Sequence, residues 1–317
     1  MRERYTGGSW CRCPLRRAST PLPGVSAVRI RLAVLAATAA LAVAPSLSAQ
    51  TTEQTMYVSV LDKDDHPTTG LDVPDFGVRE DAQNREVLRA GRTADPLDLA
   101  ILIDNSQALQ PYVNDLRKAL TTFVTRMADQ QSANVALISM ADRPTGLVDY
   151  TTSVVTLQKG ANKIFAQPGA GTVFQDSIAD AIKGIRARHN PRRALLVITT
   201  DGTDFSNVPY QHTLDMLKAS GTALQVLRIS PNGGPSLAND NARDRAYLID
   251  QGTRATGGRR QDLLSSMALA GALDQVADDL GAQYKLVYAR PGSLLPPKNV
   301  EVSVKRADLT ARGTLVP

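Results

Sequence analysis

Oxygen-bearing side chains follow the ends of two apolar runs in this chain. Asp104 and Ser106 come directly after residues 97–103, and Asp201 follows residues 194–198 after two threonines. A strand that ends in carboxylates and hydroxyls places hard oxygen ligands at the carboxyl edge of a sheet, where open α/β folds bind their ligands. The pattern therefore indicates a divalent cation site.

A glycine-rich turn supplies a third oxygen-bearing segment. It runs from Gly169 to Thr172 and precedes a helix that we expect to begin near Phe174. If the sheet is parallel, the segments around Asp104 and Asp201 leave it on the same edge, and the turn can bring Thr172 over them. Two neighbouring carboxylates repel each other, so a cation between them is the simplest way to keep both ionised. Magnesium and calcium prefer such oxygen ligands.

The elements that must position these side chains alternate between strands and helices. Apolar residues recur with helical spacing over residues 113–127, 174–185, 213–218 and 269–280. Short apolar runs typical of buried strands occupy residues 97–103, 135–138, 194–198 and 223–229, with another expected at 147–150. Strands separated by helices of this length predict a doubly wound α/β fold, with a mostly parallel sheet covered by helices on both faces.

Both flanks of this region have short alternating strands separated by polar turns. The strands are expected at residues 56–61, 75–79, 86–88, 284–288 and 300–304. Neither flank has enough strands to form a stable sheet alone. We therefore expect the N-terminal β-segment (50–94) and the C-terminal strands (283–317) to pair into one small β-unit beside a central domain at 95–282.

Residues 1–49 have the pattern of a targeting segment. Arg29 and Arg31 precede an apolar stretch at 32–44, and small residues at 46–49 offer a cleavage site. The apolar stretch is shorter than the roughly 20 residues that a membrane-spanning helix needs. The pattern predicts a signal peptide, an exported chain in the periplasm or outside the cell, and only transient contact with the membrane. A retained membrane anchor is the alternative interpretation of this segment.

The segment before Arg29 is long for a signal peptide, which suggests a translation start near Val25 or Val28. Cys11 and Cys13 both lie in it, so the mature chain would carry neither a disulfide nor a reactive thiol.

The net charge of the chain gives no support for nucleic-acid binding. The formal charge is +5, but residues 1–49 alone carry +6, so the remainder is close to neutral at −1. A neutral body lacks the basic surface that binds a phosphate backbone. The basic pairs Arg192–Arg193 and Arg259–Arg260 are interpreted as solvated loop residues.

The three oxygen-bearing segments together resemble the metal-ion-dependent adhesion site of the von Willebrand factor type A domain, over about residues 96–290. In that family an Asp-x-Ser-x-Ser motif supplies an aspartate and two hydroxyls, a glycine-rich loop supplies a threonine, and a strand end followed by glycine supplies a second aspartate. The resemblance assigns the metal ligands to Asp104, Ser106, Thr172 and Asp201. The bound ion would be magnesium, manganese or calcium.

The flanks resemble an exported bacterial subset of such proteins. In that subset a short β-segment with a Gly-Leu and an Asp-Phe pair precedes the domain, and a Tyr-x-Leu-x-Tyr strand follows it. Here Gly70–Leu71 and Asp75–Phe76 match the first part, and residues 284–288 match the second.

Ala108 departs from the family pattern, because it stands where the second serine would be. It removes one direct ligand of about six. A water molecule could fill the gap, and the neighbouring side chains that could support a cation are Gln107, Gln175 and Asp204. A second interpretation stays open, in which Asp104 and Ser106 cap the following helix and the site is silent.

Three functions follow from these residues. The first is an exported protein-binding or cell-adhesion module whose cation is completed by an exposed Asp or Glu of a protein partner. The alternative is a metal-independent scaffold that binds through its loops or its β-unit. The third is a metal-assisted hydrolase, but such an enzyme needs a general base, and no His or Glu stands beside the Asp104 motif. The sequence therefore predicts a binding protein and not an enzyme.

Overall fold

The computed structural model of the chain describes residues 51–317, apart from residues 131, 132, 232, 234–238, 293, 294, 296 and 298. The signal peptide predicted at residues 1–49 lies outside the described residues. In the part that is described, no helix is both long enough and apolar enough to cross a membrane.

A six-stranded sheet forms the centre of the fold, in the order β10-β9-β8-β5-β6-β7. The first five of these strands are parallel to their neighbours, and only β7 at the edge runs antiparallel. The strands are β5 (Asp98–Ile103), β6 (Asn134–Ser139), β7 (Thr145–Thr151), β8 (Arg193–Thr200), β9 (Thr222–Ile229) and β10 (Arg260–Leu263). The predicted mostly parallel α/β sheet is thus confirmed.

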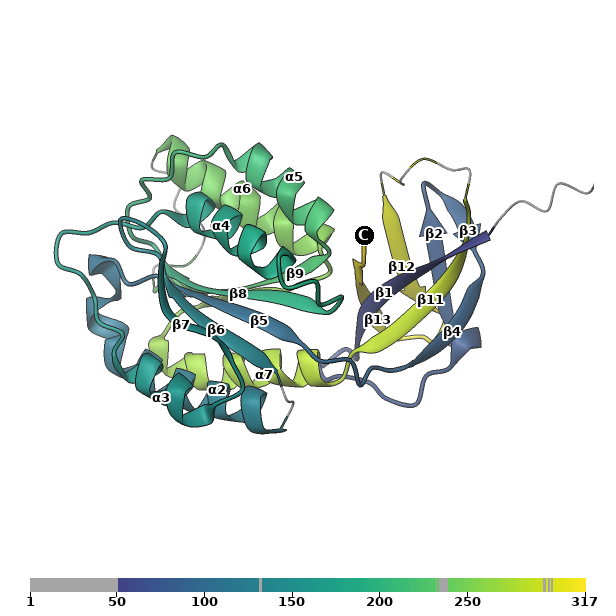
Figure 1. Ribbon diagram of the computed structural model, residues 1–317, viewed down its shortest axis with the longest axis horizontal. Coiled ribbons are helices and arrows are strands. Elements are labelled where there is room, and N and C mark those ends of the chain that lie inside the picture. Colours follow the sequence, from purple (N-terminus) through teal and green to yellow (C-terminus); the bar gives the residue numbers. More distant parts are fainter. Residues whose placement is uncertain are drawn as a thin grey trace, which may run out of the picture. The chain divides into compact units, whose positions relative to one another are not determined.

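Helices cover both faces of this sheet (Figure 1). One face packs on α2 (Val113–Thr125), α3 (Val154–Asn162) and α7 (Leu269–Gly281), and the other on α4 (Phe174–Arg186), α5 (Tyr210–Ser220) and α6 (Asp240–Ala255). Short helical turns η3 (Gln107–Tyr112), η4 (Arg126–Gln130) and η5 (Ser266–Ala268) flank α2 and precede α7. Because both faces are covered, every residue of β5 and of β9 is buried. This explains why these strands are mostly apolar and lack a regular alternation of apolar and polar residues.

The two flanks of the chain pair into a β-unit, as the sequence predicted. One sheet has the order β13-β1-β11-β4 and a second has the order β12-β2-β3. The strands are β1 (Thr51–Leu61), β2 (Phe76–Glu80), β3 (Gln83–Arg85), β4 (Val87–Arg92), β11 (Tyr284–Pro291), β12 (Val300–Val304) and β13 (Thr310–Leu315), and the turn η2 (Val73–Asp75) precedes β2. Their apolar side chains share one cluster that includes Tyr284 and Tyr288, so neither flank has to form a core alone.

The interpretation of the basic pairs as solvated loop residues was wrong for Arg192. This arginine is buried, and its guanidinium donates to the carbonyl oxygens of Asp95 and Leu280 and to the Gln283 side chain. Burial lowers the pKa of Arg192 to about 10, so it remains charged at neutral pH. It therefore ties the start of β8 to the residues that lead into β5 and β11.

Candidate metal-ion site

The candidate site lies where β5 and β8 end side by side. These two parallel strands are direct neighbours, with Ile103 opposite Ile198. The chain leaves β5 toward α2 on one face and reaches β8 from α4 on the other face. Such a reversal of strand order opens a crevice at the carboxyl ends of the strands, where α/β folds bind ligands.

Asp104 is fixed at the end of β5 by hydrogen bonds from both adjoining segments. Its Oδ1 accepts the Ser106 amide at 3.0 Å, and its Oδ2 accepts the Thr200 amide at 2.9 Å and the Thr200 hydroxyl at 2.7 Å. The Thr199 hydroxyl donates to the same Oδ2 at 3.3 Å. The carboxylate is buried and joins the ends of β5 and β8, so it has a structural role whether or not a cation is bound.

Ser106 is buried beside Asp104, and within the described residues its hydroxyl oxygen has no hydrogen-bond partner. Although Ser106 is the N-cap residue of η3, its side chain makes no capping hydrogen bond. The helix-capping interpretation therefore does not account for this hydroxyl. A buried polar atom without a partner is costly, and in a native fold it calls for a ligand or a water molecule.

Gly202 shows how closely the site loops approach each other. A Cβ atom on this glycine would lie 3.0 Å from Ser106 Oγ, 2.9 Å from Ala108 Cβ and 3.3 Å from Thr200 Oγ1. Ala108 therefore occupies the place beside Ser106 and the β8 end that the family pattern gives to the second serine. The glycine is required here because a side chain would fill the space between the two loops.

The glycine-rich turn is hydrogen-bonded to both of the other loops. The Gln107 amide donates to Ala170 O at 3.0 Å, and the Gly169 amide donates to the Gln107 side chain at 2.9 Å. On the other side, the Thr172 amide donates to Thr203 O at 2.8 Å. The Thr172 hydroxyl donates to Met140 O at 3.1 Å, which leaves its lone pairs for a cation. The structure thus brings the three predicted segments together.

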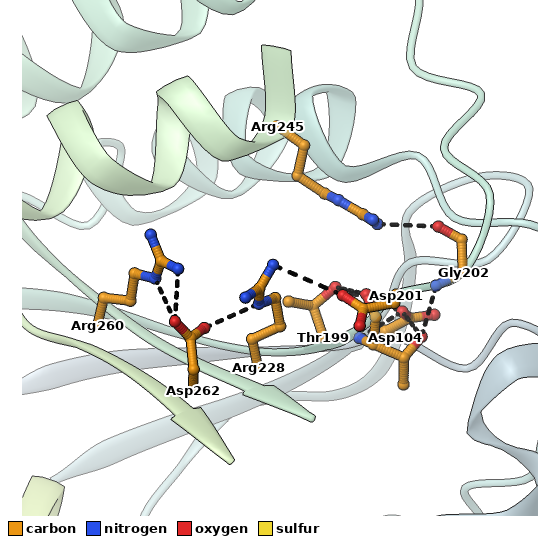
Figure 2. A network of polar contacts seen from close by, with 9 residues as sticks. Asp104, Thr199, Asp201, Gly202, Arg228, Arg245, Arg260 and Asp262 are labelled. Carbon is orange, nitrogen blue, oxygen red and sulfur yellow. Dashed lines mark hydrogen bonds and ion pairs between the residues drawn. The ribbon is translucent and has the colours of Figure 1, made fainter. Parts of the chain in front are cut away.

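Asp201 is the most accessible of the four predicted ligands, with 27% of its side chain exposed. Its nearest charged neighbour is the buried guanidinium of Arg228 on β9, with 3.6 Å between Arg228 Nη1 and Asp201 Oδ1. Figure 2 shows this pair together with Arg245, which reaches down from α6 and donates to Gly202 O at 3.1 Å. Two buried cations therefore border the β8 end of the site.

The three supporting side chains predicted from the sequence have different surroundings. Gln107 holds the glycine-rich turn, as described above. Asp204 accepts the Phe174 amide at the start of α4 and both the amide and the hydroxyl of Ser206. Burial raises the pKa of the Asp204 carboxyl above its ordinary value, and these hydrogen bonds only partly oppose it. Gln175 is buried, and its Oε1 has no partner within the described part of the chain.

The donor set suits a hard divalent cation, although it is incomplete. Hydroxyl and carboxylate oxygens from Ser106, Thr172, Asp104 and Asp201 are the ligand types that magnesium and calcium prefer, whereas Ala108 supplies none. Among the residues that the structure describes, no three His, Cys, Asp or Glu side chains cluster as a metal site, so a cation here would depend on the hydroxyls.

Three further residues, Arg228, Arg245 and Asn105, lie at this site but were not predicted from the sequence. Asn105 accepts the Ala141 amide through its side chain and the Gln167 amide through its carbonyl, and so aligns two loops with β5. Arg228 had a visible signal, because a charged residue inside an apolar strand run needs buried partners. Arg245 lies in a helix that is too polar to have been predicted.

Comparison with known families agrees with this geometry. The family model of the von Willebrand factor type A domain matches residues 98–252. This chain contains a von Willebrand factor type A domain. The matched residues run from the start of β5 into α6 and include all four predicted ligands.

Several solved structures resemble the chain at low sequence identity. A von Willebrand factor type A protein from Catenulispora acidiphila is 12% identical, with 84% of this chain and 73% of that chain covered and a TM-score of 0.48. The vWF domain of the type V pili tip protein Mfa5 from Porphyromonas gingivalis is 13% identical, with 58% of this chain and 95% of that chain covered and a TM-score of 0.42. Proximal thread matrix protein 1 from the mussel byssus, whose metal-ion-dependent adhesion site (MIDAS) motif is occupied by zinc, is 13% identical. The match covers 64% of this chain and 49% of that chain, with a TM-score of 0.47. No curated protein matches the sequence.

Proposed function

We propose that this protein is an exported binding module whose von Willebrand factor type A domain captures a carboxylate of a protein partner through a divalent cation. The observation that carries the proposal is the Ser106 hydroxyl, which is buried between the ends of β5 and β8 and has no partner among the described residues. A bound cation would give this oxygen a partner. The proposed ligands are those predicted from the sequence, Asp104, Ser106, Thr172 and Asp201.

Each ligand would contribute in its own way. Asp104 already accepts hydrogen bonds from Ser106 and Thr200, so it supplies negative charge from a fixed position. Ser106 has a free oxygen to offer directly. Asp201 is partly open to solvent, so it can adjust its position toward the ion. A water molecule in the place of the missing serine hydroxyl would complete the shell, as magnesium often retains several waters.

Exposed apolar side chains on segments close to strand ends and to the glycine-rich turn support a protein as the partner. Phe165, Phe205, Leu264 and Met267 are each more than half exposed. Phe165 precedes the glycine-rich turn, Phe205 follows the end of β8, and the other two follow the end of β10. Exposed apolar groups on segments that adjoin strand ends and the glycine-rich turn suit a protein surface better than a small soluble metabolite.

A metal-independent scaffold is the second candidate, and one observation favours it. Arg228 already provides a positive charge to Asp201, and Ala108 provides no hydroxyl. In that case, the partner would bind to the loops without a cation. Hydrolysis is not proposed, because the loops at 104–112, 166–173 and 199–209 contain no histidine or glutamate to act as a general base.

Export belongs to the proposal as well. It rests on the basic and apolar pattern of residues 1–49, which predicts removal of that segment and a periplasmic or secreted location. The near-neutral remainder of the chain supports a protein partner and not a nucleic acid.

The test combines cation titration with partner capture. Isothermal titration of the purified protein with magnesium, manganese and calcium should show binding in the millimolar range or tighter. Capture of envelope proteins should decrease when EDTA is added, and Ala108→Ser should increase both cation affinity and capture because it restores a ligand. If no cation binds and EDTA leaves capture unchanged, the cation mechanism is wrong and the scaffold function is favoured.

A further inference from the structure

Arg228 occupies an unusual position for an arginine. It is the penultimate residue of β9, in a strand that is buried along its whole length, and only 4% of its side chain is exposed. Its guanidinium lies between two carboxylates. Nε is 2.8 Å from Asp262 Oδ1, and Nη1 is 3.6 Å from Asp201 Oδ1 (Figure 2).

Asp262 anchors this arginine from the opposite side of the site. It lies on β10 directly beside Arg228 in the sheet register, and Arg260 binds its other carboxylate oxygen. Burial would raise the pKa of Asp262, but the hydrogen bond from Arg260 and the charge of Arg228 outweigh it and hold the pKa below its ordinary value. The carboxylate is therefore ionised, and Arg228 has a secure ion pair that does not depend on Asp201.

The contact between Arg228 and Asp201 is looser. At 3.6 Å it is an ion pair but not a hydrogen bond, and Arg228 Nη2 has no hydrogen-bond partner within residues that the structure describes. A buried guanidinium with unused hydrogen-bonding capacity, facing a partly exposed carboxylate, is free to strengthen or weaken this pair. It can do so without breaking its pair with Asp262.

We propose that Arg228 is an internal counter-charge for Asp201, which stabilises the site without metal and competes with a divalent cation for this carboxylate. The competition rests on the cation site proposed above, whereas the counter-charge role can be tested in metal-free protein. The negative charges at the site are those of Asp104 and Asp201, and the buried positive charges that border it are those of Arg228, which pairs with Asp201, and Arg245, which donates to Gly202 O. A cation that binds Asp201 must therefore approach a fixed positive charge.

This arrangement makes opposite predictions for two substitutions. Arg228→Gln removes the competing charge, so manganese affinity should rise at least tenfold. Asp262→Asn removes the carboxylate that holds Arg228 away from Asp201, so Arg228 should pair more closely with Asp201 and manganese affinity should fall severalfold. The matched control is Arg260→Gln, which also removes a positive charge from Asp262 but has no contact with Asp201. Arg260→Gln should change the manganese affinity less than threefold.

Titration calorimetry with manganese chloride and thermal unfolding in EDTA measure the two parts of the proposal. In EDTA, Arg228→Gln should lower the melting temperature by several degrees more in the wild-type background than in an Asp201→Asn background, because the loss of the Asp262 ion pair is common to both and only the first also takes a counter-charge from Asp201. Equal losses of melting temperature in the two backgrounds would overturn the counter-charge role. Equal manganese affinities for wild type and Arg228→Gln would overturn the competition.

If manganese binds to none of the proteins, the cation mechanism of the proposed function fails and the competition fails with it. A larger loss of melting temperature for Arg228→Gln in the wild-type background than in the Asp201→Asn background would then still support the counter-charge role, now as the permanent state of the site. The failure of the two proposals is thus distinguishable.

Discussion

Replacing Ser106 with alanine gives the sharpest test of the site, because this side chain does nothing else that the structure shows. Its hydroxyl is buried and makes no hydrogen bond to any residue of the described ranges. Leaving a buried hydroxyl unpaired costs about 1–3 kcal/mol, part of which the substitution recovers. We therefore expect the free energy of unfolding of Ser106→Ala in EDTA to equal that of wild type or to exceed it by up to about 1 kcal/mol.

Asp104→Ala provides the contrast. Its carboxylate accepts hydrogen bonds from the amides of Ser106 and Thr200 and from the Thr200 hydroxyl. Each of these buried donors would lose its partner, at a cost of about 1 kcal/mol or more each. The expected loss in the free energy of unfolding is therefore about 3–5 kcal/mol. Loss of binding in this variant would not distinguish a ligand from a structural residue.

The assay is chemical denaturation in EDTA and again with excess magnesium or manganese. Wild type should gain free energy of unfolding when the cation is added, and Ser106→Ala should gain much less. A tenfold or greater loss of cation affinity corresponds to about 1.4 kcal/mol or more of lost stabilisation. Two results would refute the reasoning. One is a large loss of stability for Ser106→Ala in EDTA, which would mean that the hydroxyl has a structural partner. The other is an unchanged response to the cation.

Two further substitutions test the surrounding fold. A Cβ atom on Gly171 would lie 2.4 Å from the Phe205 ring and 2.7 Å from Thr203 O. Gly171→Ala should therefore lower the free energy of unfolding, measured by denaturant titration, by about 1–3 kcal/mol. Adding Phe205→Ala should recover part of this loss. Asp279 on α7 is buried beside Arg312, and burial raises the pKa of the Asp279 carboxyl. Its contribution to the free energy of unfolding is therefore complete at low pH and is lost as the pH rises through the raised pKa. The stability of Asp279→Asn relative to wild type should consequently increase from about pH 4 toward pH 7, and a constant or falling difference would contradict this.

The central fold was predictable from the sequence because its signals are local. Strands β5, β8 and β9 are covered on both faces, so they appear as short apolar runs, and the helices between them show the spacing of one apolar face. The pairing of the flanks was also predictable, since neither flank could form a stable sheet alone. The number of sheets in the β-unit was not, because it depends on long-range strand register.

Several elements escaped prediction, and three of them show the physical reasons. Strand β10 has the sequence Arg-Gln-Asp-Leu, and as an edge strand it needs only backbone pairing with β9, so it carries no apolar pattern. Helix α6 is rich in charged residues, and its buried Arg245 interrupts the apolar face. Helix α3 is a short segment that buries only Leu157, Gly160 and Ala161. Such elements form because of their neighbours and not because of their own sequence.

The proximity of the proposed ligands was predictable from the sequence, but the charge balance around them was not. Asp104, Ser106, Thr172 and Asp201 can be found from the strand ends and the glycine-rich turn, because parallel strands bring their carboxyl ends to one edge. The partner of Asp201 depends on where β9 and β10 lie in the sheet. Sheet order places β9 beside β8, and the register of β10 then places Asp262 beside Arg228. A charged residue near the carboxyl end of a buried strand must find its counter-ion at that edge, so an arginine there indicates that the acidic site holds positive charge of its own.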